Sequence, residues 1–248
     1  MKKFLFWDFD GVLFNSIDEC LISSYNAYQL YKYNNNSLVS SLNKIPENYQ
    51  AFYYKHRKYV RPAGEYFIIH YAYENHIRLD DYDTFSKIIQ DSGSIISEFQ
   101  KLVFEKRNEL KTVDIKKWLA LHHPYQNVVN VWKSLSKYYV HYIVSNKDKN
   151  SIISLMDDFH MDINPDKVFG GDFSSNKLEI INYILETYKV RAEEAYFIDD
   201  NYYHLNDVAE TGIHLIFADW GYGDPPVHFS SQIMKLSLSD LPQALINQ

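Results

Sequence analysis

The feature that most constrains the fold is a short apolar run near the start of the chain that ends on two aspartates. Residues 4–7 read Phe-Leu-Phe-Trp, and Asp8, Phe9, Asp10 and Gly11 follow. A short aromatic run bounded by a glycine turn is typical of a buried β-strand. Strand spacing places Asp8 and Asp10 on one side of the backbone, and Gly11 permits a sharp exit. Because two close carboxylates repel each other, this strand end predicts a bound Mg²⁺; the alternative is that the pair caps the next turn.

Composition excludes several classes of protein. The chain has 248 residues, of which 46% are hydrophobic, and this predicts a globular protein with a large core. No segment approaches the ~20 apolar residues that cross a membrane, and the apolar start lacks a signal-peptide cleavage site. The net charge of −7 argues against a nucleic-acid partner. A single cysteine, Cys20, excludes an internal disulfide and suits a reducing compartment, so we expect a cytoplasmic protein without a membrane partner.

Strand-like runs alternate with amphipathic helical patterns in the second half of the chain. Such alternation predicts a parallel sheet with helices on both faces, which is an α/β, Rossmann-like core. The expected strands after the first are residues 138–144, 195–198 and 213–218, and residues 168–169 form a short apolar step before two glycines.

The stretch between the first strand and the later ones has a different character. Residues 38–123 show helical spacing of apolar residues and little that is typical of a strand. We therefore expect a core built from residues 1–15 and 124–248, with an inserted, mostly α-helical domain over residues 16–123.

Polar side chains follow three of the expected strands. Asp8 and Asp10 follow the first, Ser145 follows residues 138–144, and Asp199 and Asp200 follow residues 195–198. The carboxyl ends of parallel strands lie at one edge of a sheet, where ligands bind. Helix capping explains any one of these residues, but reactive groups after three separate strands favour a functional site.

These residues resemble the motifs of the haloacid dehalogenase-like hydrolase superfamily, in its phosphoglycolate phosphatase-like branch with a helical cap. The match comprises Asp8-Phe9-Asp10-Gly11-Val12, Ser145 after a strand, Lys177 at a helix start, and Phe197-Ile198-Asp199-Asp200-Asn201. The segment Trp220-Gly221-Tyr222-Gly223 also resembles one that is common in phosphoglycolate phosphatase-like members.

The resemblance implies a phosphatase that hydrolyses a small phosphorylated metabolite through an aspartyl-phosphate. Asp8 would be the nucleophile, and Asp10 would protonate the leaving oxygen and then take a proton from water. Ser145 would donate a hydrogen bond to the phosphate, with Asn146 as a further substrate-binding residue. Lys177 would hold the phosphate and Asp8 together. Lys147 competes for this role, but Lys177 lies between the second and fourth motifs, as the family requires.

The resemblance also implies a Mg²⁺ site. Asp8, Asp200 and the backbone carbonyl of Asp10 would bind the ion, while Asp199 would bind directly or through water. Many relatives carry a second acid four residues after the metal-binding one, where this chain has His204. The division of roles between Asp199 and Asp200 therefore stays open at this point.

The helical insertion is expected to exclude water from the site and to choose the substrate. Its densest basic cluster, residues 55–61, contains Arg57 and Arg61, and either can bind a second anionic group on the substrate. The alternative is an ordinary solvated face. Tyrosines crowd the same region, and aromatic residues at helical spacing are more typical of a core than of a sugar-binding platform.

Three other functions fit the same motifs less well. A phosphomutase of the β-phosphoglucomutase type would share the site but return the phosphate to a sugar. A non-catalytic binding or regulatory protein would tolerate loss of Asp8 or Asp10, and both are present. A dehalogenase would lack an acid at Asp10, because halide leaves without a proton. We expect a monomer or a small homo-oligomer.

Overall fold

The computed structural model describes residues 2–225 and 229–246, and the chain divides into two compact units. The first, called the core unit below, comprises Met1–Asn15 and His123–Gln248. The second, called the insertion, comprises Ser16–His122. Each unit is described by itself.

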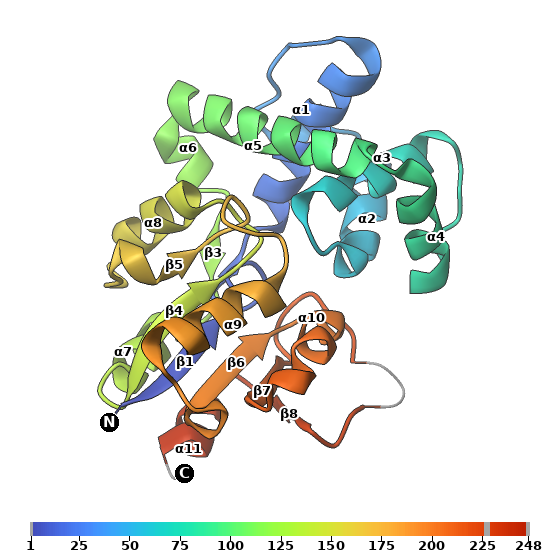
Figure 1. The fold of residues 1–248 in the computed structure, drawn as a ribbon. Helices are drawn as coiled ribbons and strands as arrows, with labels where there is room; N and C mark the ends of the chain where they lie inside the picture. Colours follow the sequence, from blue (N-terminus) through green and yellow to red (C-terminus); the bar gives the residue numbers. More distant parts are fainter. Residues whose placement is uncertain (1, 226–228, 247–248) are drawn as a thin grey trace. The chain divides into compact units, whose positions relative to one another are not determined.

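A parallel sheet organises the core unit (Figure 1). Among the described residues it contains six strands in the order β5-β4-β1-β6-β7-β8, and every neighbouring pair is parallel. Their bounds are β1 Lys3–Trp7, β4 Tyr139–Val144, β5 Val168–Phe169, β6 Ala195–Asp199, β7 His214–Ala218 and β8 Ile233–Leu236. The predicted α/β class with a Rossmann-like parallel sheet is confirmed.

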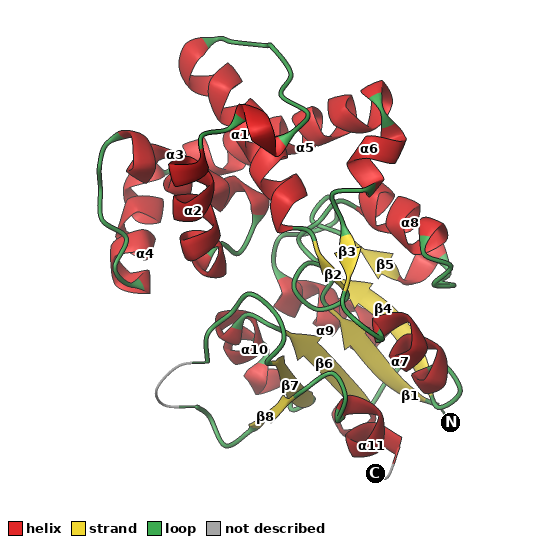
Figure 2. Ribbon diagram, turned by 180° about the vertical axis from the view of Figure 1, so that it is seen from behind, coloured by secondary structure: helices red, strands yellow, loops and turns green. Residues whose placement is uncertain are grey.

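Helices cover both faces of this sheet. In Figure 1 α9 and α10 lie in front of the strands, and Figure 2 shows α7 and α11 over the opposite face. The bounds are α7 Val128–Leu135, α8 Lys149–Asp158, α9 Lys177–Tyr188, α10 Tyr202–Asp207 and α11 Leu241–Ile246. Alternation along the strands explains the two layers, because successive side chains of a strand point to opposite faces.

The two apolar layers can be followed on the first strand. Phe6 packs with Ile180, Ile184 and other buried side chains of the layer that includes α9 and α10. Its neighbour Trp7 packs against Trp132 of α7, with ring centroids 5.6 Å apart. Both faces of β1 are therefore buried, as expected for a central strand of a parallel sheet.

A short antiparallel pair marks the point where the chain leaves and re-enters the core unit. Strands β2 (Phe14–Asn15) and β3 (His123–Pro124) pair Phe14 with Pro124 and Asn15 with His123. The ends of the inserted segment are thereby held next to each other, which makes a long insertion compatible with the fold.

The insertion is built from helices (Figure 1). Their bounds are α1 Ile17–Tyr33, α2 Glu47–His56, α3 Tyr66–Glu74, α4 Tyr82–Ser92, α5 Ile95–Val113 and α6 Ile115–Leu119. Two backbones approach closely at Gly64, where a Cβ atom would stand 2.0 Å from the carbonyl oxygen of Ile96. A side chain at position 64 would therefore force apart the segments around α3 and α5.

Tyrosines form much of the insertion's core. Tyr49, Tyr53 and Tyr66 are buried, and the rings of Tyr53 and Tyr66 stack with centroids 5.7 Å apart. The hydroxyl of Tyr49 lies 2.5 Å from Nδ1 of His70, which is itself fully buried. The prediction that aromatic residues of this region form a core is confirmed for these three tyrosines.

Across residues 2–225 and 229–246, no helix combines the length and the apolar character that crossing a membrane requires.

Candidate active site

Three neighbouring strands of the core unit end at the residues that the sequence singled out. Asp8 directly follows β1, Ser145 directly follows β4, and Asp199 is the last residue of β6. Because β4 and β6 flank β1 in parallel, their carboxyl ends lie at one edge of the sheet. The backbone N–H of Asp8 donates to the carbonyl oxygen of Ile198 (2.9 Å), which brings the ends of β1 and β6 together.

A lysine contacts both Asp8 and Asp199. Lys177 begins α9, and its Nζ lies 2.9 Å from Oδ1 of Asp8 and 2.6 Å from Oδ2 of Asp199. All three side chains are buried. Asp199 also accepts hydrogen bonds from the backbone N–H of Asn201 (2.8 Å), and Nδ1 of His204 lies 3.1 Å from its Oδ2.

The two acids therefore differ in electrostatic environment. Burial raises the pKa of Asp8 to about 6, although the Lys177 ammonium lowers it. Burial also acts to raise the pKa of Asp199, but Lys177 and His204 outweigh it and hold that pKa well below its usual value. The shorter contact to Lys177 and the added donors explain the difference. Asp199 is thus the fixed anion of the pair, and Asp8 is the more reactive one.

Asp200 is oriented by backbone groups of a glycine-rich loop. Its Oδ2 accepts hydrogen bonds from the N–H groups of Tyr222 (2.6 Å) and Gly223 (3.2 Å). A Cβ atom at position 221 would stand 2.2 Å from Cβ of Asp200, and one at position 223 would stand 1.9 Å from its carbonyl oxygen. The loop can therefore approach this carboxylate only because residues 221 and 223 are glycines.

Gly11 supplies the second close approach to Asp200. Its φ of +92° lies in the region that disfavours a side chain, and a Cβ atom there would stand 2.5 Å from Oδ2 of Asp200. The sharp exit predicted for Gly11 is confirmed, and the structure adds a reason that the sequence did not reveal.

The carboxylates at this edge fit a divalent cation. Asp8, Asp199 and Asp200 each offer an oxygen, and these oxygens lie within 4.8 Å of one another. Hard carboxylate oxygens are the ligands that Mg²⁺ prefers. Since Asp199 already receives Lys177, His204 and Asn201, Asp8 and Asp200 are the members of this cluster better suited to direct contact with a metal ion.

Asp10 is paired with a different lysine. Nζ of Lys147 lies 3.2 Å from Oδ1 and 3.5 Å from Oδ2 of Asp10. The sequence analysis treats Lys147 only as an alternative to Lys177 for holding the phosphate and Asp8 together. Nothing in the spacing of residues 10 and 147 indicates this pair, which depends on the adjacency of β1 and β4.

Ser145 and Asn146 lie in the loop that follows β4. Ser145 is buried, its N–H donates to the carbonyl oxygen of Phe169 (3.0 Å), and its Oγ accepts from the N–H of Lys147 (3.3 Å). Asn146 is half-buried. A Cβ atom at position 171 would stand 2.4 Å from the Asn146 carbonyl oxygen. The backbone at Asn146 can therefore pack this closely only because residue 171 is a glycine.

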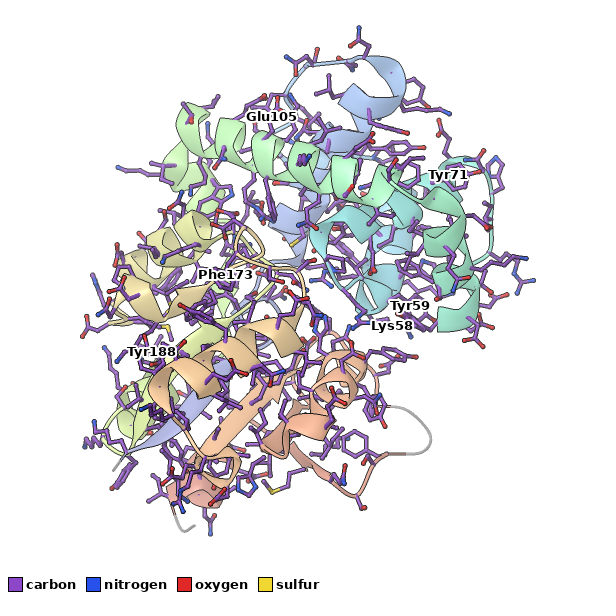
Figure 3. All side chains as sticks on the ribbon, in the orientation of Figure 1. Lys58, Tyr59, Tyr71, Glu105, Phe173 and Tyr188 are labelled. Atoms are coloured by element: carbon purple, nitrogen blue, oxygen red, sulfur yellow. The ribbon has the colours of Figure 1, made fainter. Side chains whose placement is uncertain are left out.

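The two arginines proposed for substrate binding lie in the insertion. Arg57 is 9% exposed, donates from Nη1 to the carbonyl oxygen of Val60 (3.2 Å) and lies over the ring of Tyr66. Arg61 is half-buried. The adjacent Lys58 has its Nζ 5.4 Å from the ring centre of Tyr59 (Figure 3). The basic cluster is therefore partly packed against aromatic side chains rather than wholly solvated.

His204 has a contact that the sequence left unassigned. It lies in α10 and reaches back to Asp199 at the end of β6. His204 lies five residues after Asp199, which belongs to a strand, so helical spacing in the sequence gives no signal for this contact.

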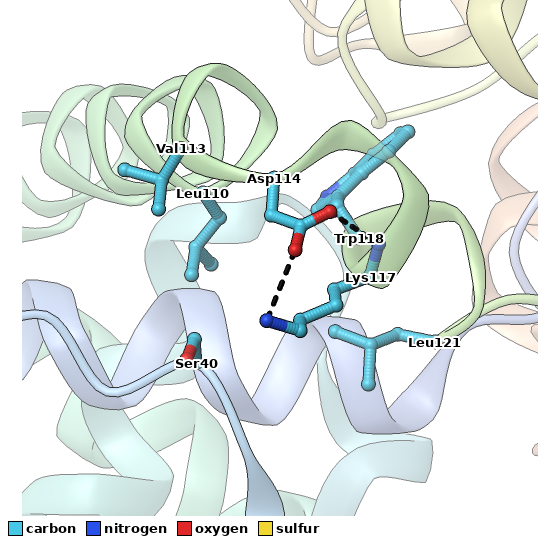
Figure 4. A pocket seen from close by; sticks show the side chains of 7 residues that line it. All are labelled: Ser40, Leu110, Val113, Asp114, Lys117, Trp118 and Leu121. Carbon is cyan, nitrogen blue, oxygen red and sulfur yellow. Dashed lines mark hydrogen bonds and ion pairs between the residues drawn. The ribbon is translucent and has the colours of Figure 1, made fainter.

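A separate cavity of about 150 Å³ lies within the insertion (Figure 4). It is lined by Ser40, Leu110, Val113, Asp114, Lys117, Trp118 and Leu121. Nζ of Lys117 lies 3.0 Å from Oδ2 of Asp114, and the same carboxylate accepts from the Lys117 N–H. None of the residues singled out by the sequence lines this cavity.

Comparisons with known proteins agree with this geometry. Residues 2–205 match the family model of the haloacid dehalogenase-like hydrolases. No curated protein matches the chain.

Solved structures with a similar fold include a predicted phosphatase from Clostridium acetobutylicum (TM-score 0.63, 16% identity, 100% of both chains covered). A haloacid dehalogenase-like family hydrolase from Streptococcus pneumoniae has a TM-score of 0.56 at 18% identity and covers 100% of this chain and 99% of its own. A predicted phosphoglycolate phosphatase from Haemophilus somnus 129pt has a TM-score of 0.63 at 14% identity, with 100% and 98% covered. With the family match over most of its length, the chain belongs to the haloacid dehalogenase-like hydrolases.

Proposed function

We propose that this protein is a Mg²⁺-dependent phosphatase that hydrolyses a small phosphorylated metabolite through a phosphoryl group carried on Asp8. The observation that carries the proposal is the cluster of Asp8, Asp199 and Asp200 at the ends of β1 and β6, with Lys177 in contact with Asp8 and Asp199. Transfer of a phosphoryl group to a carboxylate brings two anions together, which requires positive charge close to both. Two proteins of similar fold are a predicted phosphatase and a predicted phosphoglycolate phosphatase, which is in keeping with this reaction class.

Asp8 is the proposed nucleophile. With a pKa of about 6 it is mostly ionised at pH 7, so it needs no separate base. An oxygen of Asp8 attacks phosphorus, and the bond from phosphorus to the leaving oxygen breaks. Asp10 gives that oxygen a proton, so that the product leaves as an alcohol rather than an alkoxide.

The second half-reaction restores the enzyme. A water molecule attacks phosphorus, the bond between phosphorus and Asp8 breaks, and inorganic phosphate leaves. Asp10 takes the proton that the water loses, and is thereby ready for the next turnover.

The surrounding residues bind and orient the phosphate. Lys177, held between Asp8 and Asp199, supplies a positive charge next to the attacking oxygen. Ser145 and Asn146 donate hydrogen bonds to phosphoryl oxygens in this proposal. Asp8, Asp200 and the backbone carbonyl of Asp10 would hold Mg²⁺, which when bound would neutralise charge on the phosphoryl group. Asp199 acts indirectly, by holding Lys177 and His204.

We assign substrate selectivity to the insertion, with Arg61 as the residue that binds a second anionic group. Arg57 is less suited, because it is buried and donates to the Val60 carbonyl. Replacing Arg61 with Ala should raise KM for the best substrate, whereas an unchanged KM contradicts this role.

The function is tested by phosphate release from a panel of phosphorylated metabolites, with Mg²⁺ and with EDTA. We expect Mg²⁺-dependent release from a narrow set of them. Asp8→Asn should lower turnover by about 10³-fold or more, because it removes the group that carries the phosphoryl intermediate. Asp162→Asn, at an exposed position, is the matched control.

Two results would contradict the proposal. Retention of most activity in Asp8→Asn excludes an aspartyl nucleophile. Conversion of a sugar phosphate to its isomer without release of inorganic phosphate assigns a mutase instead.

A further inference from the structure

The site contains two buried lysines, and each contacts a different catalytic aspartate of the proposed mechanism. Lys177 contacts Asp8, and Lys147 contacts Asp10. Nζ of Lys177 already lies within 2.9 Å of both Asp8 and Asp199, so it is committed to that pair. A second cation next to Asp10 therefore needs its own explanation.

The backbone of Lys147 is anchored on both sides. Its N–H donates to Oγ of Ser145 (3.3 Å), and its carbonyl oxygen accepts from the N–H of Gly171 (2.9 Å). A Cβ atom at Gly170 would stand 2.6 Å from that carbonyl oxygen, so the loop after β4 packs directly on a glycine pair. Lys147 consequently starts from a fixed backbone position.

The side chain of Lys147 is also constrained. It is 0% exposed, and its ammonium contacts both oxygens of Asp10, whose side chain is 11% exposed. The Lys147 ammonium, 3.2 Å from Oδ1, favours the orientation of the Asp10 carboxylate in which this oxygen faces it. Asp10 is thus held in one orientation at the edge where β1 and β4 end.

Stability alone does not account for this pair. Removing an ammonium from water costs several kcal/mol, and a well-packed apolar pair of similar volume is often as stable as a buried ion pair. Asp10 lies two residues after Asp8, and Lys147 lies two residues after Ser145. An ion pair at this position is better explained by its effect on the orientation of the Asp10 carboxylate.

We propose that Lys147 is a positioning residue that holds the Asp10 carboxyl group where it exchanges protons with the leaving oxygen and with water. This inference rests on the proposed phosphatase function and assigns a different role to each of the two buried lysines. Lys177 serves the nucleophile, and Lys147 serves the acid–base group. Lys147 itself transfers no proton and touches no reacting atom.

Leaving-group dependence distinguishes this role from a general one. An alkyl phosphate needs a proton on its leaving oxygen, whereas the nitrophenolate of p-nitrophenyl phosphate departs without one. The ratio kcat/KM reports the steps up to departure of the leaving group. Loss of Asp10 positioning should therefore lower kcat/KM for the alkyl ester more than for the nitrophenyl ester.

The experiment measures kcat/KM for both esters with wild type, Lys147→Met, Lys147→Arg and Asp10→Asn. For Lys147→Met we expect a loss that is about tenfold or more greater with the alkyl ester, within the 10²–10⁴-fold typical of general acid catalysis. Lys147→Arg keeps the charge and should restore part of the loss. Lys149→Met removes a half-buried lysine of the same segment and is the control.

The double variant Lys147→Met/Asp10→Asn sharpens the test. If Lys147 acts through Asp10, the double variant should be no slower on the alkyl ester than Asp10→Asn alone.

The outcomes separate the two proposals. Equal losses on both esters, or a higher KM with unchanged kcat, would mean that Lys147 supports the fold or binds phosphate, and would overturn the positioning role alone. A wild type that releases no phosphate from either ester would overturn the proposed function and the role of Lys147 together.

Discussion

Both units of this protein bury carboxylates against basic side chains, but the insertion contains a buried pair of one acid and one base, whereas the sheet edge of the core unit gathers four acids near two lysines. In the insertion Glu19 is fully buried, and its Oε1 accepts from Nε of Arg107 (2.7 Å) and from Oγ of Ser23 (2.5 Å). In the core unit Lys147 contacts Asp10, and Lys177 contacts Asp8 and Asp199, while a further carboxylate, that of Asp200, lies close to Asp8 and Asp199.

The difference separates a structural ion pair from a functional site. The Glu19–Arg107 pair is complete within the fold, so packing accounts for it. The core unit keeps more negative than positive charge at one sheet edge, and the fold gains nothing from that excess. A bound cation would balance it, which agrees with the proposed Mg²⁺ site.

The largest expected effect comes from breaking the Glu19–Arg107 pair. Arg107→Met leaves Glu19 buried without its cation and should lower the free energy of unfolding by about 3–5 kcal/mol, whether or not Mg²⁺ is present. Denaturant unfolding of the purified protein measures this loss. The double variant Arg107→Met/Glu19→Leu should recover most of it, because an apolar pair replaces the ion pair.

Lys117→Met is the control for that experiment, since it removes an exposed ion pair with Asp114 in the same unit. It should leave the unfolding midpoint nearly unchanged. If Arg107→Met also lowered the free energy of unfolding only slightly, Glu19 would have to be solvated or neutral. The Glu19–Arg107 pair could then no longer be contrasted with the acids of the core unit.

A second comparison sets Glu65 of the insertion against Asp8. Both are buried acids, and Oε2 of Glu65 accepts from the N–H of Arg61 (2.7 Å). Burial raises the pKa of Glu65 to about 7, against the lowering effect of that N–H and of the Arg61 and Arg57 charges. Burial likewise raises the pKa of Asp8 to about 6, against the lowering effect of the Lys177 charge.

The raised pKa of Glu65 predicts how stability depends on pH. The unfolded chain loses this proton near pH 4.5, whereas the folded protein keeps it until about pH 7. The contribution of Glu65 to stability is therefore present below pH 4.5 and is lost as the pH rises through 7. At about 1.4 kcal/mol for each tenfold change in proton affinity, the loss is about 3 kcal/mol.

Glu65→Gln keeps an oxygen that can accept from Arg61 but does not titrate. Relative to this variant, wild type should lose about 3 kcal/mol of unfolding free energy between pH 4 and pH 8. Denaturant midpoints measured across that range test the difference, with the exposed Glu186→Gln as control. Parallel pH profiles for wild type and Glu65→Gln would show that Glu65 ionises freely.

Much of the fold could be predicted because it depends on local pattern. Apolar runs of strand character appear in the structure as β1, β4, β6 and β7, and their alternation with helices correctly predicts a parallel sheet. Parallel geometry then gathers the strand ends at one edge. Asp8, Ser145 and Asp199 could thus be placed near one another without coordinates.

Contacts between distant side chains could not be predicted in the same way. Lys147 and Asp10 are 137 residues apart, and Arg107 and Glu19 are 88 apart. Each pair depends on how whole elements pack, which residue spacing does not encode. The burial of Arg57 could not be predicted for the same reason. A basic cluster in a sequence indicates a solvated surface, and only the structure shows that Arg57 packs on the ring of Tyr66.

The smallest expected effect concerns how Asp200 is held at the sheet edge. Glu19 is bound by side chains, whereas Asp200 is bound by the backbone N–H groups of Tyr222 and Gly223. Gly223→Ala puts a Cβ atom where only 1.9 Å separates it from the Asp200 carbonyl oxygen, so the loop must retreat. Disturbing a group that orients a metal ligand should weaken Mg²⁺ binding by about 10–100-fold, or about 1.4–2.7 kcal/mol.

The Mg²⁺ concentration that half-maximally raises the thermal midpoint measures this loss without reference to activity. Gly93→Ala is the control, because a Cβ atom at position 93 meets nothing within 4 Å, although the φ of +51° there strains any side chain. It should lower the midpoint without changing the Mg²⁺ dependence. If Gly223→Ala binds Mg²⁺ as wild type does, the loop does not orient a metal ligand. If Asp200→Asn also responds to Mg²⁺ as wild type does, the excess of carboxylates at the sheet edge must be balanced by something other than the proposed ion.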